Sequence, residues 1–179
     1  MMKQIILMSC LTICLATGFS QKIYQTRSGN ISFFSNAPIE NIEAANNEVS
    51  TKLSTNGQVI FLVAIRSFVF KNSLMQEHFN EDYMESDKYP KATFFGNITN
   101  INEVNFAKDG IYNVIVNGDL EIHGVKKKIQ APAVLEIKDG KLTAKTSFEL
   151  AIKDYGITGS YIGSKIANDI KITLNCIYE

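Results

Sequence analysis

The feature that most constrains the fold of this chain is a two-residue alternation of apolar and polar side chains. It runs through four segments, residues 111–122, 125–138, 141–152 and 165–178. Such alternation is typical of strands that have one face on a core and the other in water, and these strands pair in antiparallel sheets. His-Gly at 123–124 and Asp-Gly at 139–140 separate three of the runs, where glycine allows the positive φ of tight turns.

The remaining sequence predicts five more strands. They are expected at residues 22–27, 29–35, 47–54, 58–66 and 91–101. Residues 59–65 are apolar throughout, which favours a strand covered on both faces, whereas the polar stretch 36–47 indicates a loop. Pro132 lies inside an alternating run, and since proline cannot donate to a sheet ladder it predicts an edge or a bulge. About nine long strands of this kind close naturally into an up-and-down barrel, with a two-sheet sandwich as the alternative.

One amphipathic segment, residues 73–84, interrupts the strands. Ser73 can cap a helix there, Gln76 completes the spacing of a capping box, and Pro90 prevents its continuation. One apolar stripe at helical spacing comprises Leu74, Met75, Phe79, Tyr83 and Met84. A helix this short depends on packing, so it either plugs one end of a barrel or roofs an apolar cavity, because barrel mouths are common ligand sites.

Small residues on the inward faces favour the cavity, because they leave room that larger side chains would fill. They are Gly118, Ala131, Ala133 and Ala144. Packed barrels with a taper also carry such residues, so both roles of the helix stay open at this point.

The first twenty residues differ from the rest. A lysine, an apolar run from Ile5 to Ala16 and small residues follow one another, the order of a secretory signal. The run is shorter than the roughly 20 apolar residues that span a membrane; a buried N-terminal helix and a lipoprotein anchor are the alternatives. We therefore expect a signal at 1–20, one domain at 21–179 and a periplasmic or secreted protein. Removal of the signal would leave Cys176 alone, without an internal disulfide.

Charge and motifs narrow the function. With 18 basic and 18 acidic residues, nothing draws the chain to nucleic acid. His78 and Asp82 are one helical turn apart, but two ligands do not make a metal site, and His123 is expected as a turn residue. The sequence contains no G-x-S-x-G, H-E-x-x-H, P-loop or G-x-G-x-x-G motif. We expect no catalytic residues, no metal and no cofactor, and the "VKKK" run is expected to be a solvated strand end.

Three segments resemble the YceI-like family. The first is "FVFKNSLMQEHFNEDYMESDKYPKATFFGNI", which is similar to its helix followed by S-x-KYP-x-A-x-F-x-G. The second is "YNVIVNGDLEIHGVKKKI", which resembles its G-x-L…H-G-V-x-K hairpin. The third is "FELAIKDYGI", similar to its final F…D-Y-x-I segment. The matches occur in order between residues 61 and 178.

The resemblance implies an exported, lipocalin-like antiparallel barrel. It also implies an interior apolar tunnel for a polyisoprenoid or another long-chain, fatty-acid-like lipid, without catalysis. Carried onto this chain, the tunnel would be lined by inward aromatic and aliphatic residues. These are Phe68, Phe70, Met75, Phe79, Tyr83, Phe94, Val114, Val116, Leu135 and Phe148.

The sequence thus predicts an exported carrier that encloses one long apolar ligand. The second hypothesis is a ligand-free β module that acts in interactions or stress responses. The third is a hydrolase or isomerase that acts on a bound lipid. The sequence does not identify the lipid or its head group. It also leaves the oligomeric state open, with a homodimer as one possibility.

Overall fold

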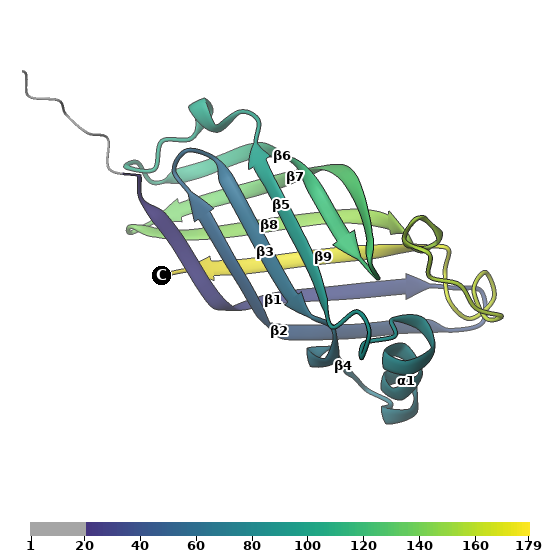
Figure 1. The fold of residues 1–179 in the computed structure, drawn as a ribbon. Helices are drawn as coiled ribbons and strands as arrows, with labels where there is room; N and C mark the ends of the chain where they lie inside the picture. The colour runs from purple at the N-terminus through teal and green to yellow at the C-terminus, as the bar shows by residue number, and fades with distance from the viewer. Residues whose placement is uncertain (1–20) are drawn as a thin grey trace, which may run out of the picture.

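The computed structural model describes residues 21–179, so the predicted signal lies outside the described residues. The described chain forms one nine-stranded antiparallel sheet with short helices at its ends (Figure 1). The strands are β1 (Ile23–Asn36), β2 (Asn41–Ser54), β3 (Gln58–Ala64), β4 (Val69–Phe70), β5 (Lys91–Ile98), β6 (Gly110–Ile122), β7 (Val125–Lys138), β8 (Lys141–Ala151) and β9 (Asp169–Tyr178). The helical segments are η1 (Ile65–Ser67), α1 (Ser73–His78), η2 (Phe79–Tyr83), η3 (Ile101–Glu103) and η4 (Ile152–Tyr155).

The sheet closes on itself as an eight-stranded barrel. Its order is β1-β9-β8-β7-β6-β5-β3-β2, and β2 returns to pair with β1 along most of both strands. The two-residue strand β4 is added to the outer part of β2. Apart from β4, strands that follow one another in the sequence are also neighbours in the barrel. The predicted all-β, up-and-down barrel with one short α-helix is therefore confirmed, and the sandwich alternative is wrong.

The barrel has two different ends, which we call the closed end and the helix end. The closed end carries the β2–β3 and β7–β8 turns, the start of β1 and the end of β9. The helix end carries α1, η2, the β6–β7 turn and the segment 152–168; the two ends lie on the left and right of Figure 1.

Alternation places side chains as predicted along the long hairpins. In β8, Leu142 and Ala144 are buried while Lys141 and Lys145 are exposed. Both predicted turns have positive φ at the glycine, 73° at Gly124 and 74° at Gly140, and in each turn the residue before the glycine shares this left-handed backbone.

Three expectations for the first half of the chain are wrong. Residues 41–47, expected in a loop, belong to β2, where buried Asn46 donates to the carbonyl of Ala64 at 2.8 Å. The two strands expected at 22–27 and 29–35 are one strand, whose register shifts around Gly29. The apolar run 59–65 is covered on one face only, because Ile60 and Leu62 are 40% and 36% exposed.

The helix differs in detail from its prediction. Its cap is Asn72, whose Oδ1 accepts the N–H of Leu74 at 2.9 Å, and Gln76 accepts the N–H of Phe70 instead of closing a capping box. After His78 the chain continues as a π-helical turn, η2. Leu74 is 56% exposed, so the predicted apolar stripe is shorter than expected.

The seam between β7 and β8 is paired over only half of β7. Register runs from Lys138↔Lys141 to Ala133↔Thr146, whereas β7 pairs with β6 along its whole length. Pro132 is the next residue, and the prediction that it marks an edge is confirmed. Within residues 21–179, the register gives residues 125–132 no partner on the β8 side.

Candidate functional site: an apolar cavity and an outer pocket

The interior of the barrel contains an apolar cavity of about 180 Å³, the inner cavity. All eight barrel strands contribute to its wall. It reaches from Leu53 and Tyr178 near the closed end to Met84 and Ile157 at the helix end. Of its lining residues only Thr93, Lys145, Thr146 and Tyr178 carry a polar group. A ligand here would therefore be held by contact with hydrocarbon and would find few hydrogen-bonding partners.

A second hollow, the outer pocket, lies at the helix end and has a volume of about 370 Å³. Its floor is apolar and includes Ile42, Phe70 and Ile170. Polar side chains also line it: Ser35, Glu40, Asn72, His78, Asp82, Tyr83, Tyr161 and Lys165. The outer pocket can therefore accept a group with hydrogen-bonding atoms, to which the inner cavity offers few partners.

An aromatic cluster stands between the two hollows. The ring of Phe79 is 5.0 Å from that of Phe70 and 5.6 Å from those of Phe33 and Phe68, measured between centroids. Phe33 and Phe79 stack at 22° and also line both hollows. Aromatic pairs at these separations attract beyond the burial of their area. The cluster thus forms a partition that separates the inner cavity from the outer pocket and borders both.

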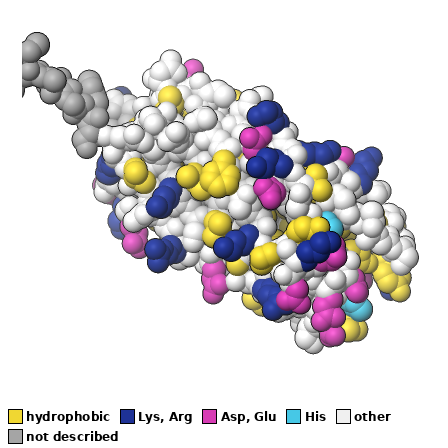
Figure 2. Space-filling view, viewed as in Figure 1, with side chains coloured by type: hydrophobic (Ala, Val, Ile, Leu, Met, Phe, Trp, Pro, Cys, Tyr) yellow, Lys and Arg dark blue, Asp and Glu magenta, His cyan; other side chains and the backbone are white. Residues whose placement is uncertain are grey.

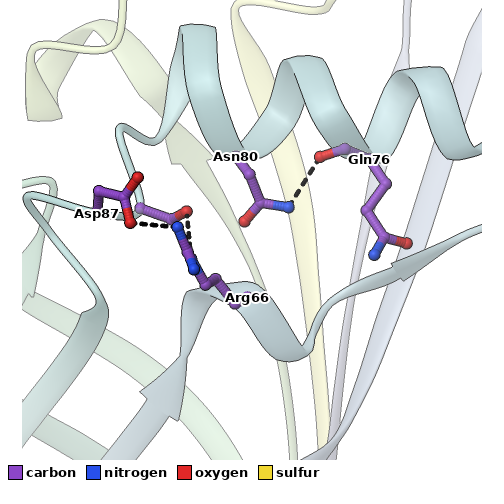
Figure 3. Close-up of polar contacts among 5 residues, drawn as sticks. Arg66, Gln76, Asn80 and Asp87 are labelled. Carbon is purple, nitrogen blue, oxygen red and sulfur yellow. Dashed lines mark hydrogen bonds and ion pairs between the residues drawn. The ribbon is translucent and has the colours of Figure 1, made fainter.

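Polar contacts fasten the helical segment that carries Phe79 (Figure 3). Arg66 on η1 forms an ion pair with Asp87 and donates from Nε to the hydroxyl of Ser86 at 3.2 Å. The side-chain amide of Asn80 donates to the backbone carbonyl of Gln76 at 2.8 Å. Together with the Gln76–Phe70 bond, these contacts join the two ends of the segment to η1 and β4.

The ten residues predicted to line a tunnel all border one of the two hollows. Phe68, Phe94, Val114, Val116, Leu135 and Phe148 line the inner cavity. Phe70, Met75 and Tyr83 line the outer pocket, and Phe79 lines both. Their contact with a ligand stays a prediction.

Sequence reasoning did not name several residues of the inner wall. Among them are Phe33, Phe61, Ile129, Ile170, Ile172 and Leu174. The alternation of β7 and β9 places four of these on the inward set, so the signal was present in the pattern. Phe33 could not be selected, because its importance comes from η2, which brings Phe79 over a strand distant in sequence.

The predicted small inward residues act in two ways. Ala131, Ala133 and Ala144 line the inner cavity and leave it open. Gly118 instead faces Gly96 on the neighbouring strand, and the ring of Phe94 lies against both glycines. A Cβ on Gly96 or Gly118 would come within 2.5 or 2.7 Å of Phe94 Cζ. The space at Gly118 is therefore filled by an aromatic ring.

Among the described residues, exposed Lys145 and buried Tyr178 are the titratable groups that border the inner cavity. His78 Nδ1 pairs with Asp82 at 2.6 Å on the exposed side of the helix. His123 lies in the β6–β7 turn, as predicted, with Nε2 2.8 Å from Glu85 and Nδ1 3.3 Å from the carbonyl of Tyr155. Burial raises the pKa of the Cys176 thiol to about 12, so it is a neutral hydrophobe at ordinary pH. Residues 21–179 hold no cluster of three or more His, Cys, Asp and Glu suited to a metal ion.

The surface carries its charges in mixed pairs. Each lysine of the "VKKK" run has an acidic neighbour: Lys126 lies near Glu121, Lys127 near Asp154 and Lys128 near Asp119. Figure 2 shows basic and acidic side chains interspersed, with acidic groups gathered at the end where α1 lies. In the described part of the chain, every helix is too short or too polar to pass through a bilayer.

Comparison with known proteins places this geometry among related barrels. The sequence model of the YceI-like domain matches residues 24–177. A polyisoprenoid binding domain from Saccharophagus degradans, implicated in plant cell wall breakdown, superposes with a TM-score of 0.76 at 14% identity, covering 88% of this chain and 97% of that one. Burkholderia cenocepacia BcnA gives 0.68 at 18% identity, covering 83% and 95%.

A third similar structure is the Campylobacter jejuni YCEI protein, with a TM-score of 0.56 at 20% identity over 74% of this chain and 80% of that one. None of the curated protein sequences matches this chain. At such low identities the solved structures show only that the fold is shared. Membership of the family is shown by the match to the sequence model over residues 24–177.

Proposed function

The chain belongs to the YceI-like family, and from that premise we propose that it is an exported carrier of one long apolar lipid. The observation that carries the proposal is the inner cavity, which residues of all eight barrel strands line almost entirely with hydrocarbon. Transfer of a lipid tail from water into such a site contributes about 0.8 kcal/mol per CH₂. Affinity can then arise with few polar contacts. The polyisoprenoid binding domain among the similar structures supports a prenyl chain as the ligand class.

The size of the two hollows indicates how a long ligand is accommodated. An engineered cavity of about 150 Å³ holds one benzene, so an inner cavity of about 180 Å³ takes only part of a long chain. The remainder extends past Phe79 into the outer pocket. Its head group lies among the polar side chains there, with Tyr161 and Lys165 within reach of a hydroxyl or phosphate.

The described groups offer little to an enzyme acting on the same lipid. Cys176 is fully buried with a raised pKa, and Lys145, the charged residue of the inner wall, is paired with Glu136 at 3.4 Å. His123 is paired with Glu85, and His78, which lines the outer pocket, is paired with Asp82. The proposal is therefore of binding and transport, without catalysis.

Native mass spectrometry of protein purified without detergent tests the proposal. We expect additional mass that disappears on solvent extraction. Ala131→Phe, which fills the inner cavity, should remove it, while Gln130→Phe on the exposed side of the same strand should retain it. A bare chain mass in the unsubstituted protein, with no uptake of an added prenol, would favour the ligand-free module.

Export is a separate part of the proposal, supported by the basic, apolar and small-residue order of residues 1–20. The mass of the protein recovered from the periplasmic or secreted fraction should correspond to a chain that begins near residue 21. An unprocessed chain retained inside the cell would contradict this part and leave lipid binding untouched.

A further inference from the structure

The seam between β7 and β8 has the properties of a side passage into the inner cavity. The two strands separate beyond Ala133↔Thr146, and Figure 1 shows the end of the β6–β7 hairpin curving away from β8. Proline at 132 cannot donate a backbone hydrogen bond, which explains why the ladder stops there. Thr146 Oγ1 donates to the carbonyl of Pro132 at 2.6 Å, which is the last contact before the two strands separate; we call this point the fork.

The inner cavity reaches this seam on both sides. Ile129 and Ala131 line it from β7, and Phe148 and Leu150 line it from β8. Ile129 and Phe148 face inward and are partly exposed, whereas their neighbours on the inward face, Ala131 and Leu150, are buried. Lys145, which is exposed beside the fork, also borders the cavity. The cavity therefore approaches the surface where the strands diverge.

At the helix end the seam is closed by side chains, among them Ile152 and Tyr155 of η4, which are buried in a cluster against which Val125 packs. Lys127 Nζ lies 3.5 Å from Asp154 Oδ2 on η4, and both side chains are more than two-fifths exposed. His123 contacts the carbonyl of Tyr155 in the same region. Exposed ion pairs are weak and easily opened.

A seam that is paired to its end, such as β3–β5, would lose ladder hydrogen bonds and leave backbone groups unpaired if it opened. The β1–β9 and β2–β3 ladders are also short, with five and four register pairs. At the helix end, however, the first is bridged by the N–H of Ala167, which donates to the hydroxyl of Ser35 at 2.8 Å, and the second is continued by β4.

We propose that the seam between residues 127–132 of β7 and 147–151 of β8 is the passage by which the lipid tail enters and leaves the inner cavity. The tail folds in sideways between the strands while the head stays near the outer pocket, so a long chain does not thread end-on past Phe79. The Lys127–Asp154 pair acts as the clasp of this passage. The inference rests on the proposed function, because it concerns traffic of the same ligand.

A reversible cross-link across the seam tests the passage. Gln130 and Glu149 are exposed on opposite sides of it, and Gln130 also stands opposite Asn117 on the fully paired β6 side. Gln130→Cys/Glu149→Cys and Gln130→Cys/Asn117→Cys therefore form a matched pair, in the full chain with Cys10→Ser and Cys14→Ser. Buried Cys176 has a high pKa and does not compete for the reagent.

The cross-linkers are bis-methanethiosulfonates of increasing length, and the probe is cis-parinaric acid exchanged with phosphatidylcholine vesicles. Closing the 130–149 pair should slow uptake and release by about an order of magnitude or more, and a reductant should restore both rates. Closing the 117–130 pair should change neither. Probe bound before closure should stay trapped.

A second pair of variants examines the clasp. Lys127→Gln should speed release about two- to five-fold, while Lys128→Gln, whose partner Asp119 lies on the paired strand β6, should leave the rate unchanged. If the protein binds the probe but both cross-links leave its rates unaltered, the passage is wrong and the carrier function stands. If the unsubstituted protein binds no long-chain probe, the carrier function fails and the passage fails with it.

Discussion

The closed end and the helix end of the barrel use the same alternating strands for opposite purposes. At the closed end Leu53, Leu142 and Cys176 are buried almost completely, and the hydroxyl of Tyr178 meets that of Thr51 at 3.1 Å. At the helix end Phe79, Phe148 and Ile170 face inward but are only partly buried. Alternation decides which side chains point inward; what covers the opening decides whether they fill the interior or surround space.

The largest contrast should appear in stability. Leu142→Ala at the closed end should lower the free energy of unfolding by about 3 kcal/mol, because a fully enclosed side chain leaves a cavity behind. Leu74→Ala on α1 removes a side chain that is 56% exposed and should change it by less than about 0.5 kcal/mol. Urea unfolding measures both. Equal losses in the two variants would erase the distinction between the ends.

Phe79→Ala should have an intermediate effect on stability and a specific effect on the ligand. We expect a loss of about 1–2 kcal/mol, below the usual 3–5 kcal/mol for a buried phenylalanine, because hollows already adjoin the ring. Joining the two hollows should also change the release rate of cis-parinaric acid in stopped-flow experiments. Phe106→Ala, which removes the partner of Tyr24 at the closed end, should weaken the fold without altering release.

Alkaline pH should act mainly on the closed end. Burial raises the pKa of Cys176 from 9.0 to about 12 and raises that of Tyr178 as well. Because the folded state holds these protons more tightly, stability is fully present below pH 9 and falls as the pH rises toward 12. The thiol alone should cost on the order of 1 kcal/mol between pH 8 and pH 10. Cys176→Ala should flatten that slope in urea titrations; an unchanged slope would place the cause elsewhere.

The smallest effect on the free energy of unfolding should come from filling part of the inner cavity, so that it resembles the packed closed end. Ala133→Leu adds volume to the inner cavity and should stabilise the ligand-free protein by about 0.5 kcal/mol, while weakening its affinity for cis-parinaric acid. Val134→Leu, on the outward side of the same strand, serves as the control. Destabilisation by Ala133→Leu together with unchanged affinity would mean that the cavity has no room at this position.

Much of the barrel was predictable because its long hairpins alternate strictly and end in glycine turns. The beginning of β2 was not, since its inward positions include Ala44 and Asn46, and a buried asparagine looks like a loop residue until its partner, the carbonyl of Ala64, is known. The prediction of the cap of α1 was wrong for a related reason. Asn72 and Ser73 are both good caps, and Gln76 contacts the backbone of β4 instead of closing a capping box.

The lining residues could be selected by face but not by location along the barrel. Periodicity placed Val114, Leu135 and Phe148 inward, and all three border the inner cavity. It could not foresee that η2 would have a π-helical turn or that β7 and β8 would part after Ala133. Both depend on which strands become neighbours, and a single strand's pattern does not contain its partner.

The arrangement of Phe94 over Gly96 and Gly118 links three positions on two strands. A methyl group on either glycine collides with the ring, and one on Gly118 also meets the carbonyl of Phe95. A Cβ at position 96 would also come within 2.6 Å of the backbone carbonyl oxygen of Asn117, so a smaller residue at 94 would not by itself admit an alanine. In a library randomised at these three codons, surviving clones should therefore keep glycine at 96 and 118 and vary mainly at 94.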